Sequence, residues 1–482
     1  MIRISRKWQW AGLLAPLAVA MLGCAVASRR PDRNNMAASS TVSRPAVAEN
    51  HATATDPAGS AARTDDASPG VSRAAYDERQ AAPLSKAAAR GGDPRYAASG
   101  EGVLELDLLI REVEAVNPSL EAAAEAWHAA AFRYPQMISL DDPMFGFFKG
   151  TQDGFMVEAS QKIPWPGKLR LRGNMASAEA SAMEWEVADT RLMLAEAAAM
   201  AFFDYYQADR QLAVNAANSR LMQEFRDIAK VRYEAGQVSQ QDVLQADVEL
   251  ADLEARRAEL QRERKIAAVR INTLLHREAE HPLPPPPEKV GVPAALPAGG
   301  ALVELALDAR PDLAAQMARI RQEEYALGLA YKEYYPDVDL AAKYDGFMPV
   351  EMRTQVGANV NVPIFWQKRR AAVCEASANV RKRRAELENR IDQVRYEVQS
   401  GWERATERGK VVRLYEERIL PASQANVDSA RINYTAGKVD FLRLVEAERQ
   451  LRDQQDKYYE TVGEYHRRLA QLERATGGAL SR

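Results

Sequence analysis

One short segment of this 482-residue chain occurs twice, and the repetition restricts the folds that the chain can adopt. Residues 232–246 read RYEAGQVSQQDVLQA, and residues 433–447 read NYTAGKVDFLRLVEA. Tyrosine, Ala-Gly, valine and alanine occupy matching positions in the two copies. Each copy places a glycine in otherwise helical sequence, and glycine readily adopts the positive φ that ends a helix. The two copies therefore predict two sharp turns, each joining a long helix to a returning one.

These segments belong to a larger tandem duplication. The first unit covers 103–280, the second covers 301–475, and the proline-rich linker 281–300 between them is expected to be extended. Each unit opens with a helix interrupted at a proline, in NPSL and in RPDL, and then reaches a Tyr-Pro pair. More residues separate these landmarks in the second unit, so its early helix is expected to be longer by about two turns.

Alternating sequence follows each Tyr-Pro pair. In FMVEASQKI (155–163) and TQVGANVNV (354–362), apolar residues alternate with polar ones, so a strand would place the two kinds on opposite faces. Aromatic residues cluster near the ends of these segments. This pattern matches transmembrane barrel strands, and a soluble antiparallel sheet would alternate in the same way. The predicted β-hairpins cover about 137–164 and about 337–364, with the register of the first strand (about 137–148) left open.

Long helical sequence joins each hairpin to its glycine turn. Residues 168–233 and 368–434 contain few helix breakers, and each would extend about 100 Å at about 1.5 Å per residue. The returning helices, about 240–276 and 440–474, carry apolar residues at coiled-coil spacing. The tip turns are expected at about 233–240 and 434–441. Ser239 and Asp440 are predicted to cap the returning helices, and Ser239 with Asp242 forms an imperfect capping box.

The N-terminus has the features of a targeting segment. A basic MIRISRK precedes an apolar stretch that ends at Met21-Leu22-Gly23-Cys24, which resembles a bacterial lipoprotein cleavage box. We expect a signal peptide over 1–23 and acylation of Cys24, with Ala25 favouring delivery to the outer membrane; an ordinary secretory signal is the alternative. Residues 24–102 are predicted to be a disordered Ala/Ser/Pro-rich tether, and 476–482 a C-terminal tail.

Charge and motif content argue against two functional classes. With 64 basic and 67 acidic residues and a net charge of -3, the chain lacks the basic excess of a nucleic-acid-binding protein. The five histidines lack metal-ligand spacing, and no glycine-rich phosphate loop follows a strand. Cys374 is interpreted as a small buried residue on a helix. We therefore expect no enzyme activity, no cofactor and no metal site.

The predicted strands require partners if they lie in a membrane. Four strands cannot close a barrel, and an open sheet in lipid would expose unpaired backbone groups. Two chains would supply eight strands with a filled interior, and three would supply twelve and begin to leave a lumen. Helices of about 100 Å that continue from such a barrel would form a tube, which is the physical outline of an export duct.

The whole folded part, about 103–475, resembles the TolC family of outer-membrane efflux factors. The resemblance rests on the duplicated units with NPSL and RPDL, on IPWPGK and VPIFWQK, and on the paired YxAGxV turns. The cleavage box resembles that of lipidated members, and SQKIPWPGKLRLRG is similar to the branch that serves heavy-metal pumps. The family implies a mainly α-helical homotrimer with four strands per chain in a twelve-stranded barrel. It also implies a periplasmic adaptor, an inner-membrane pump of the resistance-nodulation-division type, outer-membrane lipid around the barrel, and a cargo of heavy-metal cations or drugs.

The same resemblance implies roles for the turns, at a periplasmic tip where the tunnel closes and the adaptor docks. The candidate docking residues are Tyr233, Gly236, Val238, Ser239, Asp242, Tyr434, Gly437, Val439 and Asp440. Family tunnels are constricted by inward carboxylates on the last returning helix, but here Arg443 stands at the position that matches Asp242, with Glu446 one turn later. We therefore expect a mixed Arg443/Glu446 gate or an interchain ion pair with Asp242. The alternative is that these residues only shape the turns.

Two other functional classes remain open at this stage. A lipid-anchored periplasmic adaptor would have one coiled-coil hairpin flanked by β-rich domains, whereas the sequence of this chain predicts two coiled-coil hairpins and only short sheets. A soluble coiled-coil scaffold would have no barrel at all.

Overall fold

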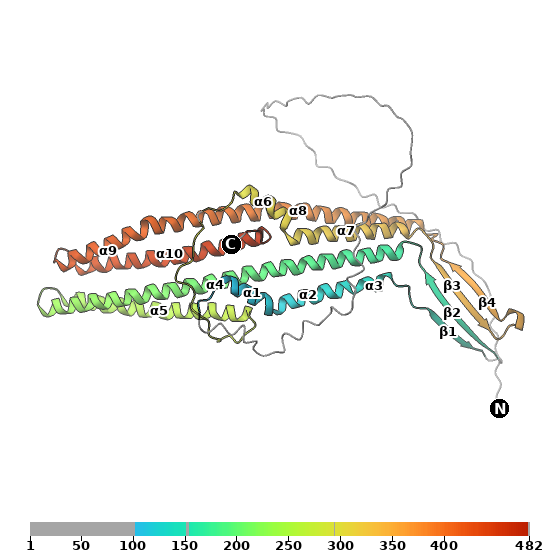
Figure 1. Ribbon diagram of the computed structural model, residues 1–482, viewed down its shortest axis with the longest axis horizontal. Coiled ribbons are helices and arrows are strands. Elements are labelled where there is room, and N and C mark those ends of the chain that lie inside the picture. Colours follow the sequence, from blue (N-terminus) through green and yellow to red (C-terminus); the bar gives the residue numbers. More distant parts are fainter. Residues whose placement is uncertain (1–101, 151–153, 294, 481–482) are drawn as a thin grey trace, which may run out of the picture. The chain divides into compact units, whose positions relative to one another are not determined.

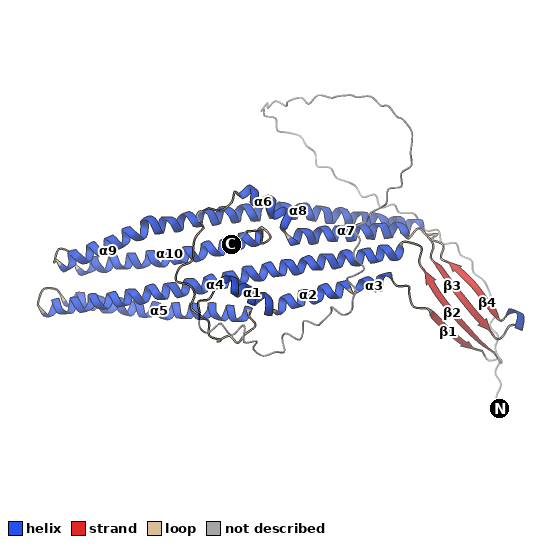
Figure 2. Ribbon diagram, in the orientation of Figure 1, coloured by secondary structure: helices blue, strands red, loops and turns tan. Residues whose placement is uncertain are grey.

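The computed structural model describes residues 102–150, 154–293 and 295–480, which consist mainly of long helices and one sheet (Figures 1 and 2). The predicted signal peptide, the tether and Cys24 lie outside these residues. The first unit contains α1 (Leu106–Val116), α2 (Pro118–Ala131), α3 (Arg133–Ile138), β1 (Met144–Lys149), β2 (Phe155–Ile163), α4 (Lys168–Glu234) and α5 (Gln240–Leu274). The second contains α6 (Gly299–Ala309), α7 (Pro311–Lys332), β3 (Val338–Asp345), β4 (Thr354–Val360), α8 (Trp366–Leu414), α9 (Leu420–Thr435) and α10 (Phe441–Ala475).

The early helices of the two units differ more than the Tyr-Pro landmarks suggest. As expected, α7 is longer than α2, with 22 residues against 14. However, α3 continues the helical path of the first unit, and Pro135 lies within its first turn, where a missing backbone N–H costs no hydrogen bond. The two Tyr-Pro pairs are therefore not equivalent. The first strand starts at Met144 rather than near 137, because residues 137 and 138 still belong to α3.

The four strands form one antiparallel sheet in the order β1-β2-β3-β4, so the central β2–β3 pairing joins the two units. The register places most apolar side chains on one face and most polar side chains on the other, as the alternation predicts. The apolar face carries Phe145, Phe147, Phe155, Val157, Val338, Leu340, Tyr344, Val356 and Val360. The polar face carries Glu158, Ser160, Lys162, Asp339, Lys343, Gln355 and Asn359.

Opposite charges face each other across the centre of the polar face. Glu158 pairs in register with Lys343, and Lys162 pairs in register with Asp339. Such cross-strand pairs stabilise a sheet and cancel most of its charge locally. Within the described residues, β1 and β4 each pair on one side only, so the sheet has two open edges.

The helices form two antiparallel coiled-coil hairpins, α4 with α5 and α8–α9 with α10 (Figure 1). The predicted seams are confirmed, since Ala246, Leu253, Leu260 and Ala267 of α5 are buried, as are Leu451, Val462, Tyr465 and Leu472 of α10. Helix α4 is continuous over 67 residues, about 100 Å. The equivalent helix of the second unit is interrupted by a π-helical turn, η5 (Tyr415–Ile419). Pro421, the second residue of α9, lacks the N–H that a regular helix would use, which accounts for this break. Cys374 of α8 is exposed, so its interpretation as a buried residue is wrong.

The proline-rich linker between the units is extended, as expected, and it is attached to the helices. The backbone N–H of Leu104 donates to Pro285 (2.9 Å), the Tyr205 hydroxyl donates to Pro284 (3.3 Å), and the Trp402 indole donates to Pro297 (2.8 Å). The linker is therefore part of the folded structure rather than a free connector.

A charged network joins α7, α8 and the end of α10. The buried Arg310 guanidinium donates to Asp312 (2.9 Å), to Glu397 (2.7 Å) and to the carbonyl of Ala475 (3.1 Å), and Arg390 bonds the same two carboxylates. Burial alone would raise the pKa of Asp312, but its hydrogen bonds to Arg310 and Arg390 outweigh burial and hold that pKa below its ordinary value.

This network predicts a large difference between two arginine substitutions. Arg310→Met should lower the free energy of unfolding by about 3 kcal/mol, because it removes the buried cation from two half-buried carboxylates, which keep only Arg390, and leaves the Ala475 carbonyl without its donor. Arg395→Met, at an exposed pair with Asp392, should cost about 1 kcal/mol or less. Denaturant unfolding followed by circular dichroism measures both. Equal losses would show that the network contributes nothing specific.

Candidate functional site

The two glycine turns have the predicted geometry. Gly236 has φ 70° and Gly437 has φ 72°. In the first turn, Gly236 N–H donates to Tyr233 O (2.9 Å) and Gln237 N–H donates to Arg232 O (2.9 Å). The second turn repeats both bonds. This pair of bonds is the Schellman motif, which satisfies the last carbonyls of a helix and requires positive φ at the glycine position.

The predicted side-chain caps of the two returning helices do not form their hydrogen bonds. Ser239 and Asp440 are the N-cap residues of α5 and α10 and have the extended backbone that caps adopt, but neither side chain accepts a bond from the first helical turn. The Ser239 hydroxyl instead lies 3.4 Å from an Asp242 carboxylate oxygen. The capping box expected from Ser239 and Asp242 is therefore wrong, because the serine and the carboxylate meet each other rather than the backbone.

The two matching tyrosines have different environments. Tyr434 is 2% exposed, whereas Tyr233 is 43% exposed. The Arg232 guanidinium lies 4.8 Å from the centre of the Tyr434 ring and donates to the Tyr434 carbonyl (2.7 Å). Phe441 packs against the same ring, with 5.5 Å between centroids. Arg232 thus joins the first turn to the second, a role that sequence reasoning missed although Arg232 matches Asn433 in the other copy.

The tips share one apolar cluster, the tip cluster, to which both hairpins contribute. It consists of Met222, Phe225, Ala229, Ala246, Leu253, Tyr434, Phe441, Leu444 and Val445. Val439 packs at its margin, as a partly buried residue. Because residues from α4, α5, α9 and α10 bury one another here, the tips of the two hairpins are held together within one chain.

A second contact between the hairpins is ionic. Glu249 of α5 is 2% exposed and accepts from Arg449 (2.6 Å) and from Arg452 (2.7 Å), both on α10. A buried carboxylate with two cations is held firmly, since removal of either side leaves a charge in a poorly solvated place. These residues were not predicted, because nothing in the local sequence shows which helices face each other.

The candidate gate residues lie on the exposed side of α10. Arg443 and Glu446 pair with each other at 3.6 Å, with side chains 76% and 51% exposed. The pairing is weak at such exposure, so both side chains remain available for other partners. Within the described residues Asp242 forms no ion pair with Arg443; its carboxylate meets Ser239 instead. The structure therefore brings Arg443 and Glu446 together within one chain, and the interchain ion pair with Asp242 stays a prediction.

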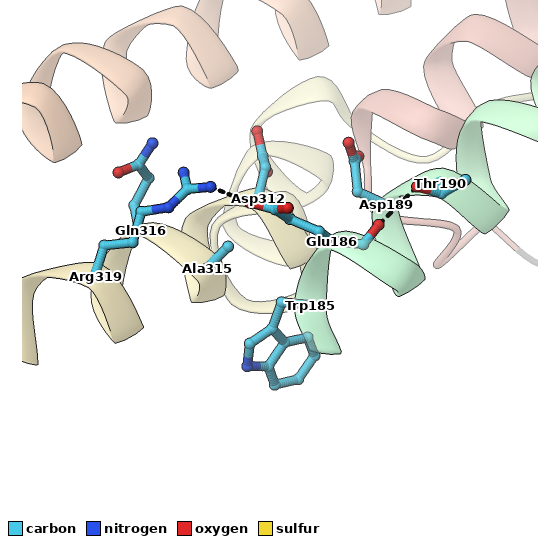
Figure 3. Close-up of a pocket in the computed structure, with 8 residues that line it drawn as sticks. All are labelled: Trp185, Glu186, Asp189, Thr190, Asp312, Ala315, Gln316 and Arg319. Atoms are coloured by element: carbon cyan, nitrogen blue, oxygen red, sulfur yellow. Dashed lines mark hydrogen bonds and ion pairs between the residues drawn. The ribbon is translucent and has the colours of Figure 1, made fainter. Parts of the chain in front are cut away.

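A surface pocket between α4 and α7 offers no catalytic arrangement (Figure 3). It is lined by Trp185, Glu186, Asp189, Thr190, Asp312, Ala315, Gln316 and Arg319. Glu186 already pairs with Arg319, and Asp312 belongs to the Arg310 network. No three His, Cys, Asp or Glu side chains gather as metal ligands in the described part of the chain. The described helices also include none with the length and apolar character needed to cross a membrane.

Two coiled-coil hairpins that continue from an open, two-faced sheet define the class of this protein: it has the architecture of an outer-membrane efflux component. The family model described as outer membrane efflux protein matches residues 116–276 and 302–478. The chain belongs to this family.

Individual relatives agree with the assignment. The cobalt-zinc-cadmium resistance protein CzcC of Cupriavidus metallidurans is 25% identical over 179 residues, which cover 36% of this chain and 42% of that protein. The alignment thus spans less than half of that relative. The outer-membrane channel OprN shares the fold with a TM-score of 0.65 and 21% identity, over 78% of this chain and 90% of that chain. The outer membrane protein VceC of Vibrio cholerae shares the fold with a TM-score of 0.65 and 19% identity, over 77% of this chain and 96% of that chain.

The geometry of the turns predicts the effect of replacing their glycines. Gly437→Val should lower the free energy of unfolding by about 1–2 kcal/mol, because a side chain at positive φ is strained. Gly437→Asn should cost less, since asparagine tolerates this conformation. The rate of amide hydrogen exchange in residues 434–441 should rise more in Gly437→Val than in Gly437→Asn. Gly291→Val, in the linker with open space around it, is the control; a loss there as large as at Gly437 would contradict the prediction.

Proposed function

We propose that this protein is the exit duct of a tripartite efflux system: a passive outer-membrane channel driven by an inner-membrane pump through a periplasmic adaptor. The observation that carries the proposal is the sheet. Its apolar face is exposed, its polar face carries balanced charges, and both its edges are unpaired in the described residues. A sheet with these three properties suits a barrel wall between lipid and a wet lumen.

The open edges indicate that several copies share the barrel. Unpaired N–H and C=O groups cost several kcal/mol each in hydrocarbon, so edge β1 of one copy needs edge β4 of another. Three copies give twelve strands, which is the number expected for the family. A soluble scaffold or adaptor would leave side chains such as Phe145 and Val356 in water. The sheet therefore favours the channel over the alternatives.

An exposed apolar stripe on α5 supports self-association along the helices. Leu244, Val248, Ile266 and Val269 are exposed, and Ala251, Ala255 and Ala258 lie between them at three- and four-residue spacing. Arg262 occupies the position of this row between Ala258 and Ile266. This row lies on the face of α5 opposite its seam with α4. Such spacing matches a second coiled-coil seam, and we assign a helix of a neighbouring copy as its occupant.

The finer parts of the proposal rest on the resemblance to known members. The cobalt-zinc-cadmium resistance relative supports metal cations as cargo. A pump of the resistance-nodulation-division type is proposed from the family resemblance of the sequence. The turns at Gly236 and Gly437 are proposed as the adaptor-docking surface, in a homotrimer anchored in the outer membrane by acylated Cys24 with its helices in the periplasm. Deletion of the gene followed by a susceptibility screen across metals, drugs and detergents tests the cargo.

The channel itself is tested on purified protein. We expect a trimeric mass in detergent, heat-modifiable mobility on gels, and ion conductance after reconstitution in planar bilayers. A monomer that remains soluble without detergent and conducts no ions would overturn the proposal.

The proposed gate predicts a change in conductance. Replacing Arg443 and Glu446 together by Ala should raise single-channel conductance several-fold, because charged side chains that narrow the tip would be removed. The matched control is Lys382→Ala with Glu386→Ala, an exposed pair of the same kind on α8. The control should conduct like the unmodified protein. Unchanged conductance in the Arg443/Glu446 variant would exclude these residues as the gate.

A further inference from the structure

The interface between the two hairpins has a polar section between two apolar ones. Helix α10 faces α4 along a row spaced by three and four residues, from Val445 in the tip cluster to Tyr459 and His466, which contact Tyr206 and Phe203. Between these contacts the row carries Glu448, Arg452 and Asp456. At this level of α4, Gln211, Asn215 and Asn218 are buried, and the Gln211 side-chain amide donates to the Asp456 carbonyl (3.3 Å).

Glu448 is the unusual member of this row. It is 3% exposed, and neither of its carboxylate oxygens has a hydrogen-bond partner in the described residues. Burial raises its pKa to about 7, against the effect of Arg452 one turn further along α10 and with a smaller contribution from Asp428 on α9. A buried carboxylate normally has a cation or several hydrogen-bond donors as partners, so the lack of any such partner at Glu448 requires an explanation.

The duplication provides the comparison. The residues of the first hairpin that match Val427 and Glu448 are Arg226 and Asp247, which form an ion pair at 2.5 Å. In the second hairpin the buried Val427 occupies the position of the arginine. The acidic residue is retained as Glu448, but it has no arginine to pair with at that position. The unpaired carboxylate is therefore specific to the second hairpin and does not follow from the shared backbone.

The nearest cations are engaged elsewhere. Arg452 lies one turn from Glu448 on one side and one turn from Asp456 on the other, but it donates to Glu249 of the first hairpin. Arg449 donates to the same carboxylate. Burial likewise raises the pKa of Asp456 to about 6, while Arg256 and Arg452 lower it and Asp453 and Glu460 add to the increase. The contact between the hairpins thus directs Arg452 to Glu249 rather than to Glu448 or Asp456, while its other terminal nitrogen lies 3.4 Å from the Asp453 carboxylate.

We infer that the contact between the two hairpins is a proton-controlled switch, in which Arg452 exchanges Glu249 for Glu448 when Glu448 ionises. With Glu448 neutral, the docked arrangement leaves no unpaired charge in the interface. Once ionised, Glu448 competes for Arg452 as an i, i+4 partner, and the hairpins separate. The moving segment lies beyond η5, where the helical hydrogen bonds are already rearranged. The inference concerns one protomer and goes beyond the channel function.

The sign of the pH dependence follows from the two states. In the docked state the pKa of Glu448 is about 7, above the ordinary 4.5 that it approaches once it is solvated and paired. The docked state therefore binds more protons between these values. The ratio of docked to separated protein is highest below about pH 4.5, falls by up to about tenfold per pH unit as pH rises towards 7, and is level above that.

Distances between spin labels test the switch on the full-length protein in detergent. The labels are placed by Arg257→Cys on α5 and Asn426→Cys on α9, two exposed positions, in a Cys374→Ser background. Labelled protein is diluted with unlabelled protein, so that each oligomer carries one labelled copy, and double electron–electron resonance is recorded from pH 5 to pH 8. We expect one short distance at pH 5 and a longer component that grows towards pH 7.

Three variants separate Glu448 from its neighbours. Glu448→Gln should keep the short distance at every pH, and Glu249→Gln should shift the transition to lower pH because Arg452 is released. Glu254→Gln, at an exposed acid of α5, should leave the pH profile unchanged. A full pH response in Glu448→Gln, its loss in Asp456→Asn alone, or a single distance from pH 5 to pH 8 in the unmodified chain would each overturn the inference.

Discussion

The pairing of β2 with β3 is the contact on which the arrangement of the two units depends. Each unit makes only one two-stranded hairpin, which is marginal alone, and the central pairing turns the two hairpins into one sheet. Both β-hairpins enter the same sheet, so α4 and α8 leave it from the same end (Figure 1). Helix α4 can therefore pack against α7 and α10. The sheet still has open edges, so the same backbone hydrogen-bonding requirement that joins the units also requires further copies.

The duplicated backbone is regular, whereas the side chains that join its halves are not. Both turns use the same Schellman bonds around glycine, and both returning helices bury a seam at coiled-coil spacing. The polar contacts between the hairpins use residues that differ between the two copies. Arg232 covers Tyr434, while Asn433 at the matching position contacts only its own helix, at Ser429. One fold repeated twice thus provides the scaffold, and the divergence between the copies provides the interface.

The parts predictable from sequence are those in which local chemistry decides the structure. Glycine at Gly236 and Gly437, alternation in 155–163 and heptad spacing in α5 each depend on neighbours a few residues away. The Tyr-Pro landmark failed at Pro135, because the first turn of a helix accepts proline as readily as a loop does. The cap at Ser239 failed because its hydroxyl meets the Asp242 carboxylate instead of the backbone, and the structure does not explain the missing cap at Asp440. The Glu249 contacts required knowledge of which helices meet, which no local pattern contains.

The placement of charge along the hairpins suggests why the second one carries both the proposed gate and the proposed switch. In the first hairpin Asp247 is paired with Arg226, so its charge is neutralised within the hairpin at ordinary pH. In the second, Val427 removes that partner, and Arg449 and Arg452 are directed to the other hairpin instead. These two arginines therefore stabilise the contact between the hairpins, whereas Arg408 of α8 pairs with Glu464 of α10 inside the second hairpin. Because these pairs cross the interface, a change in the charge of one partner alters the free-energy difference between the docked and separated hairpins, and such a small bias is what a movable element needs.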